Sequence, residues 1–276
     1  MRLLKFAAGG QRLLGVHSGD EIISLGRFAD HADVFSNDNL DQLLRASKNG
    51  GARFSLDEVD YQPPLAHSAR VFCVGINFLK KHPIAGVVST APERPTIFVK
   101  LAESFVGHRQ AIEYPEGVSE RLDYEGELAV VIGRGGRHIR PEDAYQHVFG
   151  YTLVNDGSVR DWQKHSLVSG KNFFHSSSCG PWVVTADEID NPMTLDMITE
   201  WNGEVVQSTN MNAMLFDIPY VINHISQFTP LKPGDIIATG TPAGSGGSMD
   251  PQRFLRPGDK IKITISGLGT LSNTVT

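Results

Sequence analysis

Short apolar runs separated by glycine and proline turns recur along the whole chain. Near the N-terminus three runs alternate in polarity, and the turns Gly9-Gly10 and Gly19-Asp20 separate them, a pattern that predicts β-hairpins. These runs are Leu3–Phe6, Leu13–His17 and Glu21–Ser24. Leu40–Ser47 has apolar positions at helical spacing. The segment Tyr61-Gln62-Pro63-Pro64 is stiffened by its prolines, so we expect a small N-terminal α+β domain over residues 1–65 and a larger domain over 66–276.

The larger part carries the stronger strand signals. Its predicted strands are Val71–Gly75, Thr96–Lys100, Glu127–Gly133, Gly150–Asn155, Pro181–Ala186, Asp235–Thr239 and Lys260–Ser266. The last two each follow a Pro-Gly-Asp turn. Pro141–His147 reads as a short helix with proline in its first turn. Many short strands and 28 glycines predict a mostly-β, α+β protein with few helices.

Composition narrows the classes of partner. The formal net charge is -6, and basic residues form no stripe, which argues against a nucleic-acid partner. No apolar run approaches the roughly 20 residues that cross a bilayer, and the N-terminus lacks the apolar core of a secretion signal. Cys73 and Cys179 are too few for a disulfide framework and read as buried thiols. We therefore expect a cytoplasmic protein without membrane contact.

Two glutamates lie at the start of the strongest strand signal. Glu125 and Glu127 are two residues apart, and residues at this spacing on a strand share a face. Two adjacent carboxylates repel each other unless a charge neutralises them, and a hard cation such as Mg²⁺, Mn²⁺ or Ca²⁺ suits carboxylate ligands. The alternative is a solvated pair at an exposed strand end.

A second segment supports the cation. The strand Gly150–Asn155 runs into Asp156, which could complete a three-carboxylate set. Arg160, Gln163 and Lys171 follow and could hold an anionic substrate, because arginine grips carboxylates with two donors. The alternative is a charged helix face with internal pairs. Thr241 lies in the stretch 239–244 (TGTPAG), where the adjacent Gly240 could expose its hydroxyl to a ligand, or where it could simply form part of a turn.

A series of ordered motifs resembles the fumarylacetoacetate hydrolase family, from about Arg70 to the C-terminus. The matching stretches are 74–77 (VGIN), 103–108 (ESFVGH), 122–133 (LDYEGELAVVIG), 150–163 (GYTLVNDGSVRDWQ), 170–173 (GKNF), 180–189 (GPWVVTADEI), 231–244 (LKPGDIIATGTPAG) and 257–273 (PGDKIKITISGLGTLSN). The resemblance implies a catalytic domain of the family's mixed β-sandwich roll type, preceded by a small N-terminal domain. It also implies a homodimer that acts on a small keto-acid substrate.

The resemblance assigns roles to particular residues. It implies a divalent metal, Mg²⁺ or Mn²⁺ with Ca²⁺ as an alternative, held by Glu125, Glu127 and Asp156. The family's substrate-contacting arginine, glutamine and threonine correspond to Arg160, Gln163 and Thr241, and its lysine corresponds to Lys171, expected to act in catalysis.

The segment from Gly75 to Pro83 departs from the family pattern. Many members carry a histidine and a glutamate there that activate water, but Lys81 stands at the histidine position and His82 follows one residue late. His82 is our second candidate catalytic residue, or else a surface residue of a lid.

The expected activity is cleavage of a C–C bond in a 2,4-diketo acid by a metal-dependent hydrolase, through an enolate that the cation stabilises. Alternatives on the same scaffold are an oxaloacetate-type decarboxylase, a tautomerase, and a 2-hydroxy-dienoate isomerase or hydratase. A non-catalytic metabolite-binding protein is an alternative of a different class.

Overall fold

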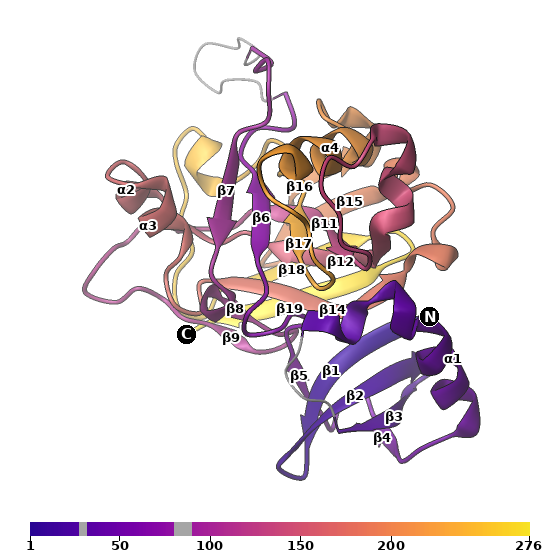
Figure 1. Ribbon diagram of the computed structural model, residues 1–276. Coiled ribbons are helices and arrows are strands. Elements are labelled where there is room, and N and C mark those ends of the chain that lie inside the picture. The colour runs from indigo at the N-terminus through magenta and orange to yellow at the C-terminus, as the bar shows by residue number, and fades with distance from the viewer. Residues whose placement is uncertain (28–31, 80–89) are drawn as a thin grey trace.

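The structure is a computed structural model, and it describes residues 1–27, 32–79 and 90–276 (Figure 1). One long mixed sheet runs in the order β4-β3-β2-β1-β14-β12-β11-β17-β6-β7, with β5 beside β1 and β8 beside β14. Its strands are β1 (Arg2–Ala8), β2 (Gln11–Ser18), β3 (Glu21–Arg27), β4 (Arg53–Ser55), β5 (Asp60–Gln62), β6 (Val71–Val74), β7 (Ile97–Lys100), β8 (Phe105–Val106), β11 (Gly126–Ile132), β12 (Val148–Asn155), β14 (Ser177–Thr185) and β17 (Ile236–Ala238). The predicted mostly-β class is confirmed.

The predicted N-terminal hairpins are present. β1 and β2 pair antiparallel around Gly9-Gly10, where both residues have positive φ, a conformation that glycine adopts without steric cost. β1 also pairs with β14 through Arg2 opposite Val184 and Leu3 opposite Val183. The N-terminal strands thus extend the long sheet of the larger part, and the domain boundary at residue 65 stays a prediction.

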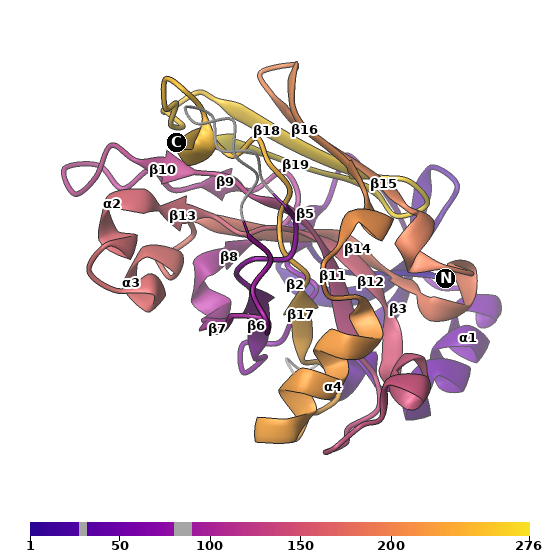
Figure 2. The same ribbon diagram turned by 90° about the horizontal axis from the view of Figure 1, so that it is seen from above.

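A second, five-stranded sheet covers one face of the long sheet (Figure 2). It runs in the order β16-β15-β18-β19-β9, and its strands are β9 (Ala111–Ile112), β15 (Asp196–Trp201), β16 (Glu204–Asn210), β18 (Lys260–Ile265) and β19 (Gly269–Val275). The short strands β10 (Leu122–Asp123) and β13 (Ser158–Val159) form a separate pair.

Hydrophobic cores lie on both faces of β11, because alternate residues of a strand point to opposite sides. Leu128 and Val130 join the core that includes Met197 of β15. Ala129 and Val131 join a second core on the other face. Glu127 shares the alternation of Ala129 and Val131, so it faces away from the five-stranded sheet.

The helices are short and lie outside the sheets. The α-helices are α1 (Leu40–Asn49), α2 (Arg160–Gln163), α3 (Leu167–Lys171) and α4 (Ile218–Phe228). The 3-10 helices are η1 (Ala32–Phe35), η2 (Asn37–Asn39), η3 (Ala102–Ser104), η4 (Pro141–His147), η5 (Ala186–Glu188), η6 (Pro192–Thr194), η7 (Met211–Ala213) and η8 (Gly246–Ser248). The helix predicted over 141–147 is thus of the 3-10 type. In the described residues, none of the helices combines the length and apolarity that a membrane span requires.

Candidate metal centre

Strand register brings the three predicted acidic ligands to one face of the long sheet. β11 and β12 are antiparallel neighbours with Glu127 opposite Val154. Glu125 precedes β11, Asp156 follows β12, and the Asp156 N–H donates to the Glu125 carbonyl oxygen over 2.8 Å. Opposite residues share a face and alternate residues return to it, so all three carboxylates point the same way.

The glycine between the two glutamates faces the other sheet. A Cβ on Gly126 would lie 2.3 Å from Thr199 Oγ1 of β15 and 3.3 Å from the side chain of Ile263 on β18. Only glycine lets β11 approach the five-stranded sheet this closely. The Glu-Gly-Glu spacing therefore satisfies both faces at once, with packing on one side and carboxylates on the other.

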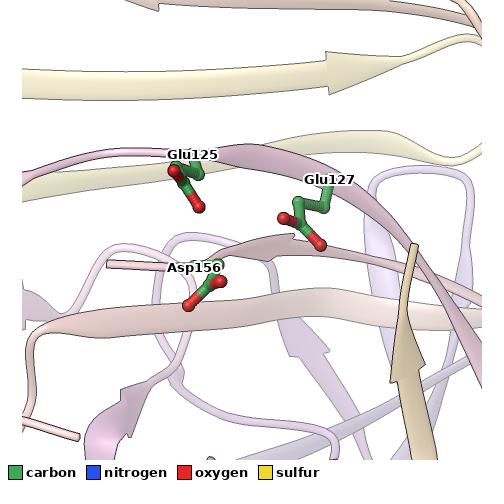
Figure 3. Close-up of side chains that lie close together, drawn as sticks. All are labelled: Glu125, Glu127 and Asp156. Atoms are coloured by element: carbon green, nitrogen blue, oxygen red, sulfur yellow. The ribbon is translucent and has the colours of Figure 1, made fainter. Parts of the chain in front are cut away.

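The three carboxylates converge on one point. One oxygen from each of Glu125, Glu127 and Asp156 lies within 4.8 Å of the other two, and Figure 3 shows the side chains directed toward a common space. All three residues are buried. Buried, converging carboxylate oxygens are the ligand type that suits a divalent cation such as Mg²⁺, Mn²⁺ or Ca²⁺.

The environment of Glu127 is unfavourable for a free carboxylate. Burial raises its pKa well above the ordinary value, and the negative charges of Asp156 and Glu125 raise it further. The positive charge of Lys171 offsets part of this effect, and so does the Gly240 N–H, which donates to Glu127 Oε2 over 2.8 Å. A bound cation would supply the missing positive charge.

Lys171, the expected catalytic lysine, lies among the three carboxylates. Its Nζ donates to Glu125 Oε2 and to Asp156 Oδ2, each over 2.6 Å. Burial acts to lower the pKa of Lys171, but the charges of Asp156 and Glu125 outweigh burial and raise it. Lys171 is therefore an ammonium group in direct contact with two of the expected metal ligands.

A second buried lysine, which the sequence analysis did not single out, lies behind Asp156. Lys100 ends β7, and its Nζ is 2.9 Å from Asp156 Oδ1. Four strand spacings separate β7 from β12, which is about 19 Å in a flat sheet at about 4.8 Å each. The long sheet must therefore curl strongly to bring these two side chains together, and sequence patterns do not report such curvature.

Arg160, predicted to bind substrate, lies beside the cluster of three carboxylates, next to Glu125. Its Nη2 donates to Glu125 Oε1 and its Nε to Asp123 Oδ2, each over 2.7 Å. Asp123 is fully buried and also accepts the N–H groups of Gly246 and Gly247, each over 2.8 Å. Asp123 thus anchors Arg160, a role that the sequence analysis missed. Gln163 lies next to Arg160, with its Oε1 accepting from Nη1 over 3.3 Å.

Thr241 is close to the centre, but its hydroxyl has structural partners. Oγ1 donates to the Gly126 carbonyl oxygen over 2.9 Å and accepts from Gln207 Nε2 over 2.8 Å. The Gly126 N–H donates to Gln207 Oε1 over 3.0 Å. Thr241 and Gln207 together fix the backbone between the two glutamates. The substrate contact expected of Thr241 stays a prediction.

His82, the second candidate catalytic residue, lies outside the described residues. The structure therefore brings together Glu125, Glu127, Asp156, Lys171 and Arg160, and it places Gln163 and Thr241 beside them.

Known proteins share both the sequence and the fold. A family profile described as fumarylacetoacetate (FAA) hydrolase C-terminal matches residues 70–276. The oxaloacetate tautomerase YisK of Bacillus subtilis (strain 168) is 44% identical over 230 residues, which are 82% of this chain and 76% of that protein.

Two solved structures superimpose over the whole chain. A fumarylacetoacetate hydrolase from Exiguobacterium antarcticum has a TM-score of 0.84 at 33% identity, covering 100% of this chain and 99% of its own. A maleylpyruvate hydrolase from Sphingobium sp. SYK-6, in complex with manganese(II) and pyruvate, has a TM-score of 0.83 at 29% identity, with the same coverages. The profile match and the level of identity show that the chain belongs to the fumarylacetoacetate hydrolase family of enzymes.

Proposed function

We propose that this protein is a divalent-cation-dependent enzyme that interconverts the keto and enol forms of oxaloacetate. One observation carries the proposal: three buried carboxylates converge within 4.8 Å with the Lys171 ammonium beside them. This arrangement suits a small 2-keto acid whose reaction develops negative charge on its keto oxygen. The similarity to an oxaloacetate tautomerase, at 44% identity over 82% of the chain, supports oxaloacetate as the substrate.

Glu125, Glu127 and Asp156 would hold the cation, with Mg²⁺ or Mn²⁺ as the expected ion. When bound, such a cation supplies a Lewis acid for an α-keto carboxylate. The Lys171 ammonium adds positive charge next to the same ligands. Arg160 and Gln163 are partly exposed neighbours at the edge of the site, and they would hold a substrate carboxylate.

Tautomerisation moves one proton from C3 of oxaloacetate to the keto oxygen and consumes no water. The reaction therefore has no need of the water-activating histidine and glutamate whose spacing is altered near His82. This is why we place tautomerisation ahead of the hydrolysis that the family resemblance first suggested.

The test follows the ultraviolet absorbance of enol-oxaloacetate after mixing with chelator-stripped protein, with and without added Mn²⁺. We expect conversion above the spontaneous rate only with the cation, and a loss of at least about 100-fold in Glu125→Gln, which is typical when a catalytic electrostatic group is removed. Glu116→Gln, at an exposed glutamate, is the matched control and should behave as wild type. Full activity of Glu125→Gln in chelator would refute the proposal.

Hydrolysis of a C–C bond in a 2,4-diketo acid is the second candidate. The likeness to a fumarylacetoacetate hydrolase and a maleylpyruvate hydrolase favours it. It requires a base for water, for which His82 is the candidate. An acylpyruvate cleaved by wild type but not by His82→Ala would assign hydrolysis to this protein. Release of CO₂ from oxaloacetate, or isomerisation of a 2-hydroxy-dienoate, would identify the decarboxylase or isomerase alternatives in the same assay panel.

A homodimer is part of the proposal, on the basis of the family resemblance. Light scattering coupled to gel filtration should give about twice the 30.2 kDa of one chain. A mass of one chain at micromolar concentration would contradict it.

A further inference from the structure

Lys100 is a fully buried lysine that pairs with one of the three expected metal ligands. Its side chain has 0% exposure, and Asp156, with which it pairs, has 1%. Besides Asp156 Oδ1 at 2.9 Å, its Nζ donates to the Gly157 carbonyl oxygen over 3.0 Å and to the Lys171 carbonyl oxygen. These contacts tie the end of β12 to the end of α3, the two segments that carry Asp156 and Lys171.

The two lysines next to Asp156 are held in different ways. Lys171 Nζ donates to two carboxylates, Glu125 and Asp156, which are expected metal ligands. A cation that takes these oxygens therefore competes directly with Lys171. Lys100 is also held by two backbone carbonyl groups, which do not belong to the carboxylate set. Its position is fixed independently of what binds the carboxylates.

We propose that Lys100 is the resident counter-ion of the cation site, a positioning residue that holds Asp156 and α3 in place before the cation arrives. This inference rests on the proposed function, because it concerns the same carboxylates. Lys100 touches neither the substrate nor the cation. It acts through Asp156, whose Oδ1 it neutralises, and through the Lys171 backbone, which it anchors.

Removal of Lys100 would change both the stability of the fold and the affinity for the cation. Without Lys100, Asp156 and its acidic neighbours lose one balancing charge in a buried setting, so the cation-free protein is strongly destabilised. A bound divalent cation replaces that charge. Lys100 also repels the cation across Asp156, so its removal favours cation binding. Loss of Lys100 should therefore lower stability most in the absence of cation, and should tighten cation binding.

The experiment compares thermal unfolding in EDTA and in saturating Mn²⁺, together with titration calorimetry of Mn²⁺ into the stripped protein. For Lys100→Met we expect the unfolding midpoint in EDTA to fall by roughly 10 °C. Mn²⁺ should restore most of this loss, so the Mn²⁺-induced rise exceeds that of wild type, and the Kd for Mn²⁺ should fall roughly tenfold. Lys100→Gln, which loses the charge but keeps an N–H donor, should show the same trend if Lys100→Met does not fold in EDTA.

Two controls isolate the charge. Lys100→Arg keeps the charge and should show the Mn²⁺-induced rise of wild type. Lys5→Met removes another buried lysine, on β1, whose Nζ donates to the Leu65 carbonyl oxygen rather than to the site. It should lower the unfolding midpoint equally with and without Mn²⁺.

Three results would overturn the inference. An Mn²⁺-induced rise in Lys100→Met equal to or smaller than that of wild type would show that Lys100 is merely structural. Neutral variants that stay unfolded even in saturating Mn²⁺ would show the same. Absence of any Mn²⁺-induced rise in wild type would instead refute the cation site itself, and this inference with it.

Discussion

Within the described chain, Glu127 differs from Glu125 and Asp156, the other two expected metal ligands, in having a backbone N–H, rather than a lysine or arginine, as its hydrogen-bond donor. Its pKa is raised by burial and by the charges of Asp156 and Glu125. A raised pKa means that the protonated form is favoured in the folded protein. Glu127 therefore stabilises the cation-free fold below its ordinary pKa of 4.5, and this contribution is lost as the pH rises through the higher pKa of the folded state.

We predict that the stripped protein in EDTA becomes less stable as the pH rises from about 5 to about 8, and that the stabilisation by Mn²⁺ grows over the same range. The cation binds the deprotonated Glu127 carboxylate, so it removes the free-energy cost of burying that negative charge. Thermal unfolding against pH, with and without Mn²⁺, measures both trends. Glu127→Gln should flatten the dependence in EDTA, and an unchanged slope in that variant would assign the effect to other groups.

Residue types near the site were largely predictable, and their partners were not. The spacing of Glu125 and Glu127 on a strand predicted that their carboxylates share a face, and the apolar run into Asp156 suggested the third ligand. Lys100 and Asp123 were missed because their contacts join segments that are distant in sequence. The strand predicted over 96–100 includes Lys100, which lies opposite Val71 in the structure, but the strand pattern did not indicate a contact with Asp156.

At the scale of an element, β11 is constrained on both faces. We predict that Gly126→Ala destabilises the protein by about 1–3 kcal/mol, because the added methyl group overpacks the contact with Thr199 on β15. It should also weaken Mn²⁺ binding, since β11 positions both glutamates. Denaturant unfolding and calorimetry measure these effects.

Gly75→Ala is the matched control for that substitution. Gly75 is exposed, and a Cβ there would lie 3.4 Å from the Thr96 side chain, an ordinary contact. Its stability should change by less than about 0.5 kcal/mol. If Gly126→Ala were equally mild, the tight packing of β11 on the second sheet could not be what requires glycine there.

Strands with a continuous apolar run or a regular alternation of apolar and polar residues were predicted from the sequence. Elements without such a pattern were missed. The strand cores over 127–133 and 150–155 correspond to β11 and β12. Helix α4 was missed, although Asp217 caps it, Pro219 lies in its first turn, and Ile218, Val221 and Ile222 have helical spacing. β15 and β16 were missed because their apolar and polar residues do not alternate cleanly: Thr199 and Gln207 occupy buried positions, whereas Ile198 and Val205 are exposed.

At the scale of the molecule, the N-terminal strands contribute to a core shared with the rest. Leu3, Val16 and Phe35 belong to the same buried cluster as Ala129 and Val131 of β11. The pairing of β1 with β14 continues the sheet across the predicted boundary. Residues on both sides of the predicted boundary at residue 65 therefore contribute to one hydrophobic core.

We predict that a fragment comprising residues 66–276 does not fold stably by itself. Removing the first 65 residues would expose the apolar side chains that pack against Leu3 and Phe35, and would leave the edge of β14 unpaired. The fragment should be insoluble or should unfold without a cooperative transition, as measured by calorimetry. A soluble fragment with the unfolding midpoint of the full chain would contradict this and would establish an independent domain.

Crystals grown with Mn²⁺ would show whether Glu125, Glu127 and Asp156 hold one divalent cation. Anomalous scattering from manganese locates the ion without reference to activity. We predict one peak per chain, about 2.1 Å from a carboxylate oxygen of each of the three residues, as for hard cations with octahedral oxygen ligands. The absence of a peak at this point in saturating Mn²⁺, or a peak whose ligands are other residues, would show that Glu125, Glu127 and Asp156 do not form the cation site.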